Sequence, residues 1–501
     1  MVFRIVIVVG IFWSSLRARP LQVPAEALDK SRQAAALIQT GNPEAAIPIF
    51  KVLAREFPSE TSFKINLAIA EFKTNRYRET IDDCTSLLRT QPGLFPAWLF
   101  LGASHLKLGD HANAEEALRK ALSIQPADVN ARLMFAQTLL AEEKYAEAAD
   151  SYKKAAEAMP DNAAVWFGLA NAYEGLTAAA LGRLQRTAPD SAESAALSGD
   201  FALDNGQLAP AFQHYRRALE LNSEFPGMHA AIAGIYRLSG HPQWAEAEQR
   251  LETVTSPDCA KQQLACTYAA GRFQELAAAQ PGTPDAAYWQ VKALHELSRS
   301  AYAHLRALPP SRENSEAEAV ANERSGRYRE AAAAWKQALQ AAPGDAGIER
   351  RLALALCRSN DCHSALPLID GLLKQQPSAA ELNYLYGLAL SETSDFAGAQ
   401  PYLETAVQLD SAFLPARAAL GVAYLETGKA DRAIPHLEAA AKEDDDGRRH
   451  YQLARAYQAS GNREAATRVL QEYRRIQERH ELEAANEPRI TPPPISPARG
   501  L

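Results

Sequence analysis

A pattern of large and small side chains recurs every 34 residues along most of this chain. It is most complete over residues 95–126, with large side chains at positions 4, 7, 11 and 24 of the unit and small ones at positions 8, 20 and 27. This alternation is typical of two helices that pack closely against each other. A glycine at position 15 and a proline at position 32 predict the turn between the helices and the end of the second one. The residues concerned are Trp98, Leu101, Gly102, His105, Gly109, Ala114, Leu118, Ala121 and Pro126.

The same spacing recurs in register on both sides of this unit. Units begin at residues 27, 61, 95, 129 and 163, then at 192 and 226, and again near 312, 346, 380, 414 and 447. The pattern resembles the tetratricopeptide repeat (TPR) family, of the bacterial multi-repeat type, in which a helical hairpin recurs every 34 residues. This resemblance implies an all-α, superhelical solenoid of antiparallel helical hairpins, arranged in two blocks.

Two stretches depart from the repeat in the same way. Residues 163–190 and 285–310 lack the turn glycine, and the first reaches its proline early. Aligned on Pro189 and Pro310, they share apolar and small residues four apart, which mark one stripe of a helix. We predict that 163–186 and 285–307 each form one long helix; the alternative is two short helices with an unrecognised turn.

These patterns divide the chain into five parts. The predicted parts are a signal-like or anchor segment (1–26), a first TPR block (27–258) with the fused-helix unit 163–190, an irregular joint (259–311) with the fused-helix unit 285–310, a second TPR block (312–486) with a C-terminal capping helix, and a proline-rich disordered tail (487–501).

The first residues resemble a secretory signal peptide. Arg4 precedes an apolar run over residues 5–13, and a basic start with a short apolar core is typical of such segments. Arg17 and Arg19 follow the run, and no small-x-small cleavage site lies close by, which favours a cytoplasmic protein instead. We expect export to the periplasm or attachment to the envelope, with membrane contact only through residues 1–20 if they stay uncleaved; a cytoplasmic location is the alternative.

Composition and motifs favour a protein that is neither catalytic nor a nucleic-acid binder. The formal net charge is −7 and no basic stripe is sustained, so DNA or RNA has little electrostatic attraction to this chain. His295 and Glu296 begin like a zinc-protease helix, but Arg299 takes the place of the second histidine. Because repeats occupy residues 27–480, no separate catalytic domain fits. We expect no cofactor and no metal; an enzyme with a site in a groove is a remote alternative.

The five cysteines are too few and too scattered for a disulfide framework. Cys357 and Cys362 flank the turn of their hairpin, so a bond between them is predicted in an oxidising compartment; two buried small residues are the alternative. Cys259 and Cys266 would lie about 10 Å apart on a helix, which predicts no bond between them.

In the TPR family the first helix of each hairpin lines the concave surface, with positions 2, 5, 9, 12 and 13 facing it. Carried onto the first block, the resemblance implies a mostly apolar groove suited to an extended peptide or a partner helix. Its predicted residues are Ile65, Ile69, Phe72, Lys73, Leu99, Leu106, Lys107, Leu133, Gln137, Phe167 and Asn171. The matching positions of the second block are more polar and include Glu316, Tyr384, Glu392, Tyr451 and Arg455.

The function expected from this resemblance is a non-catalytic scaffold or adaptor that binds protein or peptide partners. A cytoplasmic regulatory or co-chaperone adaptor is the alternative. Chaperone-binding members hold a C-terminal carboxylate with a lysine and asparagines from successive repeats, and no three successive repeats here supply that set. The pattern leaves the oligomeric state open.

Overall fold

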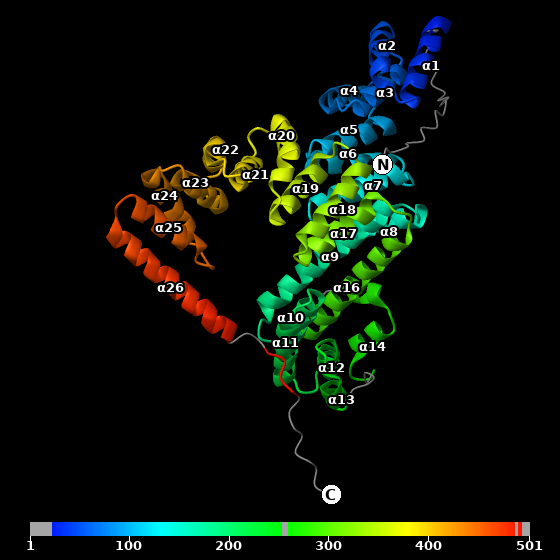
Figure 1. Ribbon diagram of the computed structural model, residues 1–501. Coiled ribbons are helices and arrows are strands. Elements are labelled where there is room, and N and C mark those ends of the chain that lie inside the picture. The colour runs from blue at the N-terminus through cyan, green and yellow to red at the C-terminus, as the bar shows by residue number, and fades with distance from the viewer. Residues whose placement is uncertain (1–22, 253–258, 280, 486–488, 493–501) are drawn as a thin grey trace. The chain divides into compact units, whose positions relative to one another are not determined.

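The computed structural model describes residues 23–252, 259–279, 281–485 and 489–492. These residues form helices joined by turns and short extended segments and contain no strand (Figure 1), which confirms the all-α prediction. None of the helices in the described ranges is both long and apolar enough to cross a membrane. Most of the predicted signal-like segment and of the proline-rich tail lies outside these residues.

The helices fall into two compact units, each built from two separate stretches of sequence. Of the described residues, one unit comprises 23–186, 259–279 and 281–308, and the other comprises 187–252, 309–485 and 489–492. Residues 259–308, expected above as an irregular joint, group with residues up to 186 in this division.

The first unit begins with four regular hairpins: α1 (Ala25–Gln39), α2 (Pro43–Glu56), α3 (Thr61–Lys73), α4 (Tyr77–Thr90), α5 (Phe95–Lys107), α6 (His111–Ile124), α7 (Val129–Ala141) and α8 (Tyr145–Ala158). Its remaining helices are α9 (Ala163–Thr187), α14 (Gln263–Ala269), α15 (Phe273–Ala278) and α16 (Pro284–Ala307).

The second unit contains two hairpins before residue 258: α10 (Ala192–Asp204), α11 (Leu208–Leu221), α12 (Met228–Leu238) and α13 (Pro242–Gln249). After residue 309 it contains α17 (Arg312–Arg324), α18 (Tyr328–Ala341), α19 (Ala346–Arg358), the short 3₁₀ helix η1 (His363–Ala365), α20 (Leu366–Gln375), α21 (Ala380–Glu392), α22 (Phe396–Leu409), α23 (Leu414–Glu426), α24 (Ala430–Ala441), α25 (Arg448–Ala459) and α26 (Arg463–Ala485).

The turn of each regular hairpin places position 15 in the left-handed backbone region. Gly109 has a φ of 76° at this position, which glycine adopts readily because it has no Cβ. Four repeats carry Asn75, Glu143, Asn360 or Ser394 at the same position, and these residues still have φ values of 59° to 64°. The packing of the two helices therefore imposes this turn even where the residue disfavours it.

The two stretches that lack a turn glycine each form one uninterrupted helix, α9 with 25 residues and α16 with 24, as predicted. These helices pack side by side in opposite directions (Figure 1). Trp166 near the start of α9 stacks on His304 near the end of α16, with ring centroids 3.8 Å apart. At the other end Arg183 Nη2 donates to Gln290 Oε1 at 3.2 Å. Each long helix thus has an antiparallel partner, although that partner is distant in sequence.

The two helices of a hairpin approach most closely at position 8. A Cβ added at Gly102 would lie 2.6 Å from Leu118 Cγ, which is the side chain at position 24 of the same unit. The same pair recurs as Gly387 with Leu403 and as Gly421 with Leu437, at 2.5 and 2.6 Å. Because real Cβ atoms do not approach so closely, only glycine fits at these points without displacing the leucine side chain of the second helix.

The substitution Gly102→Leu should therefore overpack the α5–α6 contact and lower the free energy of unfolding by about 1–3 kcal/mol. Thermal or denaturant unfolding followed by circular dichroism measures this loss. Gly93→Leu is the matched control, since nothing lies within 4 Å of a Cβ at Gly93 and its φ is not positive. Equal stability of the two variants would mean that the α5–α6 contact is not as close as described.

Candidate partner-binding groove

A hollow of the second unit lies on the first helices of three successive hairpins, α21, α23 and α25. It has a volume of about 610 Å³. Its lining residues are Tyr384, Leu388, Ser391, Pro415, Ala418, Ala419, Val422, Leu437, Glu443, Asp444, Asp445, Asp446, Arg448, Arg449 and Gln452. On α21 and α23 these side chains stand mainly at positions 2, 5, 9 and 12 of their units, which are the positions that line the concave surface in the resembling family.

The floor of this groove is apolar and hollow because its central side chains are small. Ala418 and Ala419 stand at the middle of α23, flanked by Leu388 of α21 and Val422 of α23. Tyr384 closes one side with its ring edge-on to Phe413, at a centroid distance of 5.0 Å. Burial raises the pKa of Tyr384 above its ordinary value, so its hydroxyl stays protonated at neutral pH.

Acidic side chains from the loop between α24 and α25 line the groove along residues 443–446. Arg448 pairs with Asp446 at 3.0 Å, which leaves that pair close to neutral. Glu443 and Asp445 are exposed to solvent, and neither carboxylate belongs to an ion pair recorded among the described residues. The rim therefore offers negative charge to a ligand.

Hydrogen bonds hold this acidic loop in place. Asp444 is buried, and its Oδ2 lies 2.7 Å from both the backbone nitrogen and the ring Nδ1 of His450. Burial acts to raise the pKa of Asp444, but these hydrogen bonds outweigh it, so the pKa lies below its ordinary value. Arg449 Nη1 also donates to the carbonyl oxygens of Ala440 and Glu443, at 3.3 and 2.6 Å. The rim is thus a fixed structure, ordered before any ligand binds.

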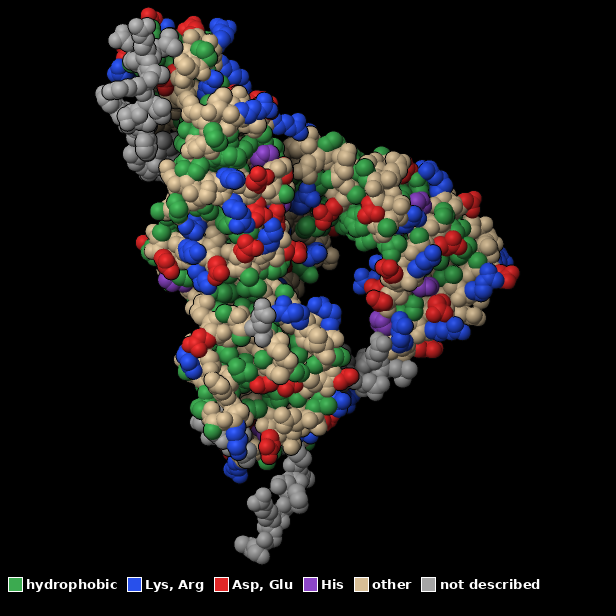
Figure 2. Space-filling view, turned by 180° about the vertical axis from the view of Figure 1, so that it is seen from behind, with side chains coloured by type: hydrophobic (Ala, Val, Ile, Leu, Met, Phe, Trp, Pro, Cys, Tyr) green, Lys and Arg blue, Asp and Glu red, His purple; other side chains and the backbone are tan. Residues whose placement is uncertain are grey.

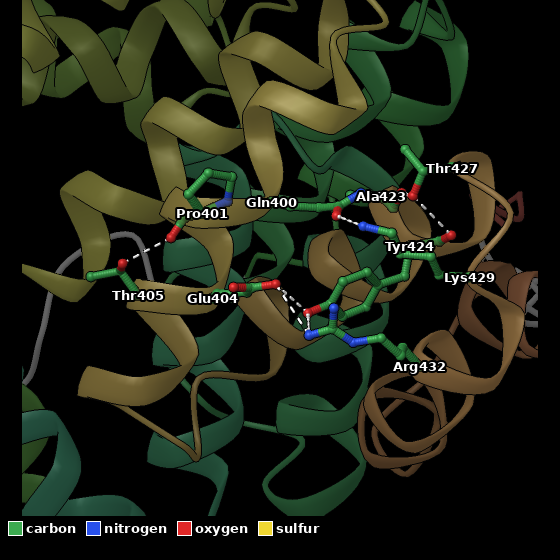
Figure 3. Close-up of polar contacts among 9 residues, drawn as sticks. All are labelled: Gln400, Pro401, Glu404, Thr405, Ala423, Tyr424, Thr427, Lys429 and Arg432. Carbon is green, nitrogen blue, oxygen red and sulfur yellow. Dashed lines mark hydrogen bonds and ion pairs between the residues drawn. The ribbon is translucent and has the colours of Figure 1, made fainter.

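A polar network behind the groove fixes α23 between its neighbours (Figure 3). Gln400 of α22 donates from Nε2 to the Ala423 carbonyl at 3.2 Å and to Thr427 Oγ1 at 2.7 Å. Lys429 donates in turn to Gln400 Oε1 at 2.6 Å. Both polar atoms of the Gln400 side chain are hydrogen-bonded, so the orientation of α23, and with it the groove floor, is specified.

The same helix is held a second time through Tyr424. Its hydroxyl donates to Glu404 of α22 and accepts a hydrogen bond from Arg432 Nη2 of α24 at 2.6 Å (Figure 3). Burial, followed by the hydrogen bond to Glu404, raises the pKa of Tyr424 to about 12. This hydroxyl therefore stays a donor throughout the physiological pH range.

The groove residues predicted in the first block are only partly available to a partner. Ile69, Leu99 and Leu133 are 4%, 8% and 1% exposed, so they pack between the protein's own helices. These three side chains are covered by the neighbouring helices, whereas Ile65 at position 5 of its unit keeps some exposure.

The remaining predicted residues of this block keep some exposure. Lys73 and Lys107 are exposed, and the half-buried side chains are Ile65, Phe72, Leu106, Gln137, Phe167 and Asn171. Phe72 packs edge-on to Phe100 at a centroid distance of 5.4 Å. Asn171 Oδ1 already accepts a hydrogen bond from Tyr302 of α16 at 3.0 Å.

Both cysteine pairs are bonded in the structure. Cys357 is joined to Cys362 across the turn between α19 and α20, where the repeat register places them. Cys259 is joined to Cys266, which corrects the expectation that this pair cannot bond. That expectation assumed one helix, whereas α14 begins at Gln263 and Cys259 lies in the preceding turn, which brings the two Cα atoms to 5.6 Å.

Sequence reasoning missed the acidic loop as part of a site. The sequence analysis used residues 443–446 only to locate the start of the last repeat. Four consecutive acidic residues next to a concave surface could have indicated a binding site. Charged side chains of both signs are otherwise interspersed on the face drawn in Figure 2. Within the described ranges, no three His, Cys, Asp or Glu residues are grouped so that they could hold a metal ion.

Comparison with known proteins identifies repeats in both halves of the chain. Models described as tetratricopeptide repeat match residues 95–128, 133–176, 350–411 and 390–452. Among solved structures, the crystal structure of MamA is 21% identical and covers 33% of this chain and 96% of its own, with a TM-score of 0.29. MamA from Desulfovibrio magneticus is 20% identical, with coverages of 33% and 95% and a TM-score of 0.30.

A tetratricopeptide repeat protein from Parabacteroides merdae is 11% identical and covers 66% of this chain and all of its own, with a TM-score of 0.33. No curated protein matches the chain.

The cysteine pairing predicts a specific count of reactive thiols in protein purified without reductant. Cys84 is buried, and burial, then Asp83 and Glu71, raise the pKa of its thiol to about 12, so the native protein should react with no equivalent of iodoacetamide at pH 8. Unfolding in urea should expose one thiol, and urea with reductant should expose all five.

Mass spectrometry of the alkylated protein gives this count, and Cys84→Ala is the control that should leave no reactive thiol in urea alone. Three or five modified cysteines in the unreduced, unfolded protein would contradict the observed pairing.

Proposed function

Because this chain is a tetratricopeptide-repeat protein, we propose that it is a non-catalytic scaffold that binds a segment of a partner protein in the groove of α21, α23 and α25. Repeats of this kind are typically interaction modules, since stacked hairpins present an extended concave surface. The observation that carries the proposal is the hollow of about 610 Å³ with an apolar floor and a fixed acidic rim.

The lining of the groove specifies the chemistry of the partner segment. Ala418, Ala419 and Val422 leave room for one or two apolar side chains, which would gain free energy by leaving water. Glu443 and Asp445 at the rim favour a lysine or arginine beside that apolar anchor. The proposed ligand is therefore a peptide or helical segment that combines an apolar anchor with an adjacent basic residue.

The same charges oppose the binding of nucleic acid. Phosphate groups would meet carboxylates at the rim, and Arg448 and Arg449 are already engaged by Asp446 and by backbone carbonyls. A protein partner is therefore favoured over DNA or RNA.

We also propose that the protein acts outside the cytoplasm, in the periplasm or at the cell envelope. The two disulfides support this location, because such bonds persist in oxidising compartments and are rare in the cytoplasm. The signal-like residues 1–25 supply the second line of support. A cytoplasmic adaptor with reduced cysteines is the competing function.

The groove is tested by selecting peptides from a random display library on the full chain and measuring their affinity by fluorescence anisotropy. Selected peptides should share an apolar residue next to lysine or arginine. Val422→Glu should weaken their binding by at least about tenfold, which corresponds to about 1.4 kcal/mol. Replacing both Glu443 and Asp445 by lysine should weaken binding and reduce its dependence on salt.

Leu409→Glu is the matched control, because Leu409 is 44% exposed at the end of α22 and does not line the groove. Its binding should equal that of the unmodified protein, and circular dichroism checks that all variants stay folded. If Val422→Glu retained full affinity for the selected peptides, they would bind elsewhere and the groove would be excluded.

Export is tested by fusing residues 1–25 to alkaline phosphatase that lacks its own signal and is active only outside the cytoplasm. The fusion should be active, and a Val8→Arg version should be inactive because the charge interrupts the apolar run. An inactive unmodified fusion would favour the cytoplasmic alternative.

A further inference from the structure

A short segment near the C-terminus lies against helices that precede it by more than 200 residues. Residues 489–492 belong to the same compact unit as α11 and α12, and they run beside α11 in Figure 1. Gln213 Nε2 of α11 donates to the carbonyl oxygen of Arg489 at 3.2 Å. The hydroxyl of Tyr236 of α12 donates to the carbonyl oxygen of Thr491 at 2.6 Å. From the sequence we expected only that residues 487–501 form a disordered tail.

These two hydrogen bonds identify an extended ligand. The accepting carbonyls belong to residues two apart, and alternate carbonyls of an extended chain point to the same side. Ile490 between them is half-buried, whereas Arg489, Thr491 and Pro492 are exposed. Recognition therefore uses the backbone and one apolar side chain.

The sequence of the segment favours this extended form before it docks. Thr491 precedes Pro492, and a residue before proline is restricted to extended backbone conformations. Two further prolines follow at 493 and 494. A chain stiffened in this way loses little conformational entropy when it binds, which is the physical basis of proline-rich recognition.

The receptor surface is equally well organised. With the segment in place Tyr236 is 1% exposed, and its hydroxyl is satisfied by the Thr491 carbonyl. Its ring packs against Phe212 of α11 and Trp244 of α13, each at a centroid distance of 5.6 Å. Burial, then the nearby Glu248, raises the pKa of Tyr236 to about 12, which keeps it a hydrogen-bond donor.

We propose that the α11–α12 surface is a binding site for an extended, proline-containing segment, and that residues 489–492 of the same chain occupy it. The C-terminal end of α26 is thereby tethered to the repeats α10–α13. This site is separate from the groove of α21, α23 and α25, and it stands whether or not that groove binds a partner.

The covalent link gives the chain's own segment an advantage over any competing peptide. A short covalent connection supplies an effective concentration of roughly millimolar. A peptide added from solution must displace the attached segment, so its apparent dissociation constant on the unmodified chain should be roughly millimolar or weaker. A variant that releases the segment should show the intrinsic, tighter affinity.

The test uses a fluorescein-labelled peptide of residues 486–501 and the full chain. Ile490→Asp in the protein removes the one half-buried side chain of the segment, so the labelled peptide should bind this variant at least about tenfold more tightly than the unmodified protein. Thr491→Asp is the matched control, since the Thr491 side chain is exposed and only its backbone carbonyl is bound, so peptide binding should stay as weak as in the unmodified chain. Adding Tyr236→Phe to Ile490→Asp should cost about fivefold in peptide affinity by removing the donor to Thr491.

Equal peptide affinity for the unmodified chain and Ile490→Asp, or no binding to either at millimolar peptide, would overturn the proposal. Analytical ultracentrifugation excludes the other arrangement: a dimer of the unmodified chain that dissociates in Ile490→Asp would place the segment on a second copy instead. Both conclusions, binding within one chain or to a second copy, require that the circular dichroism spectra of the variants are unchanged.

Discussion

The architecture depends on how closely the two helices of each hairpin approach at positions 8 and 24. Gly102 and Leu118 set this distance in one repeat, and Gly387 with Leu403 sets it in another. A hydrogen atom at position 8 allows the large side chain at position 24 to lie directly on the backbone of the first helix. Other hairpins carry alanine at position 8, as Ala68, Ala136 and Ala353 do, so a small side chain is what the hairpins share at this point. Successive hairpins therefore stack with a similar offset and present their first helices on one surface.

The groove follows from what stands at the neighbouring positions of the same register. In the first repeats positions 5 and 9 carry Ile69, Leu99 and Leu133, which are long enough to reach the next helix and be buried. In α23 position 5 carries Ala418, which cannot span that distance, and the hollow lies beside it. The same backbone arrangement thus produces a packed surface in one place and a binding site in another, according to side-chain volume.

Contacts between residues distant in sequence then modify the simple array. The long helices α9 and α16 lack the second helix of a normal hairpin. They pack against each other instead, through the Trp166–His304 stack and the Arg183–Gln290 hydrogen bond. Residues 489–492 are held to α11 and α12 by Gln213 and Tyr236 in a similar way. Both arrangements use apolar packing for affinity and a few hydrogen bonds for register.

The 34-residue pattern by itself determined the helical hairpins, the two long helices and the proximity of Cys357 to Cys362. Each of these features depends on residues that lie close together in the sequence. The family resemblance named Tyr384 among the concave positions, whereas it did not name Val422 of the same groove. Only the tertiary structure decided which of those positions are open, because burial depends on the side chains of the next repeat, as Ile69 and Leu133 show. It also decided the pairing of α9 with α16 and the position of residues 489–492, since a repeat pattern specifies contacts between neighbouring units and carries no information about which distant surfaces meet.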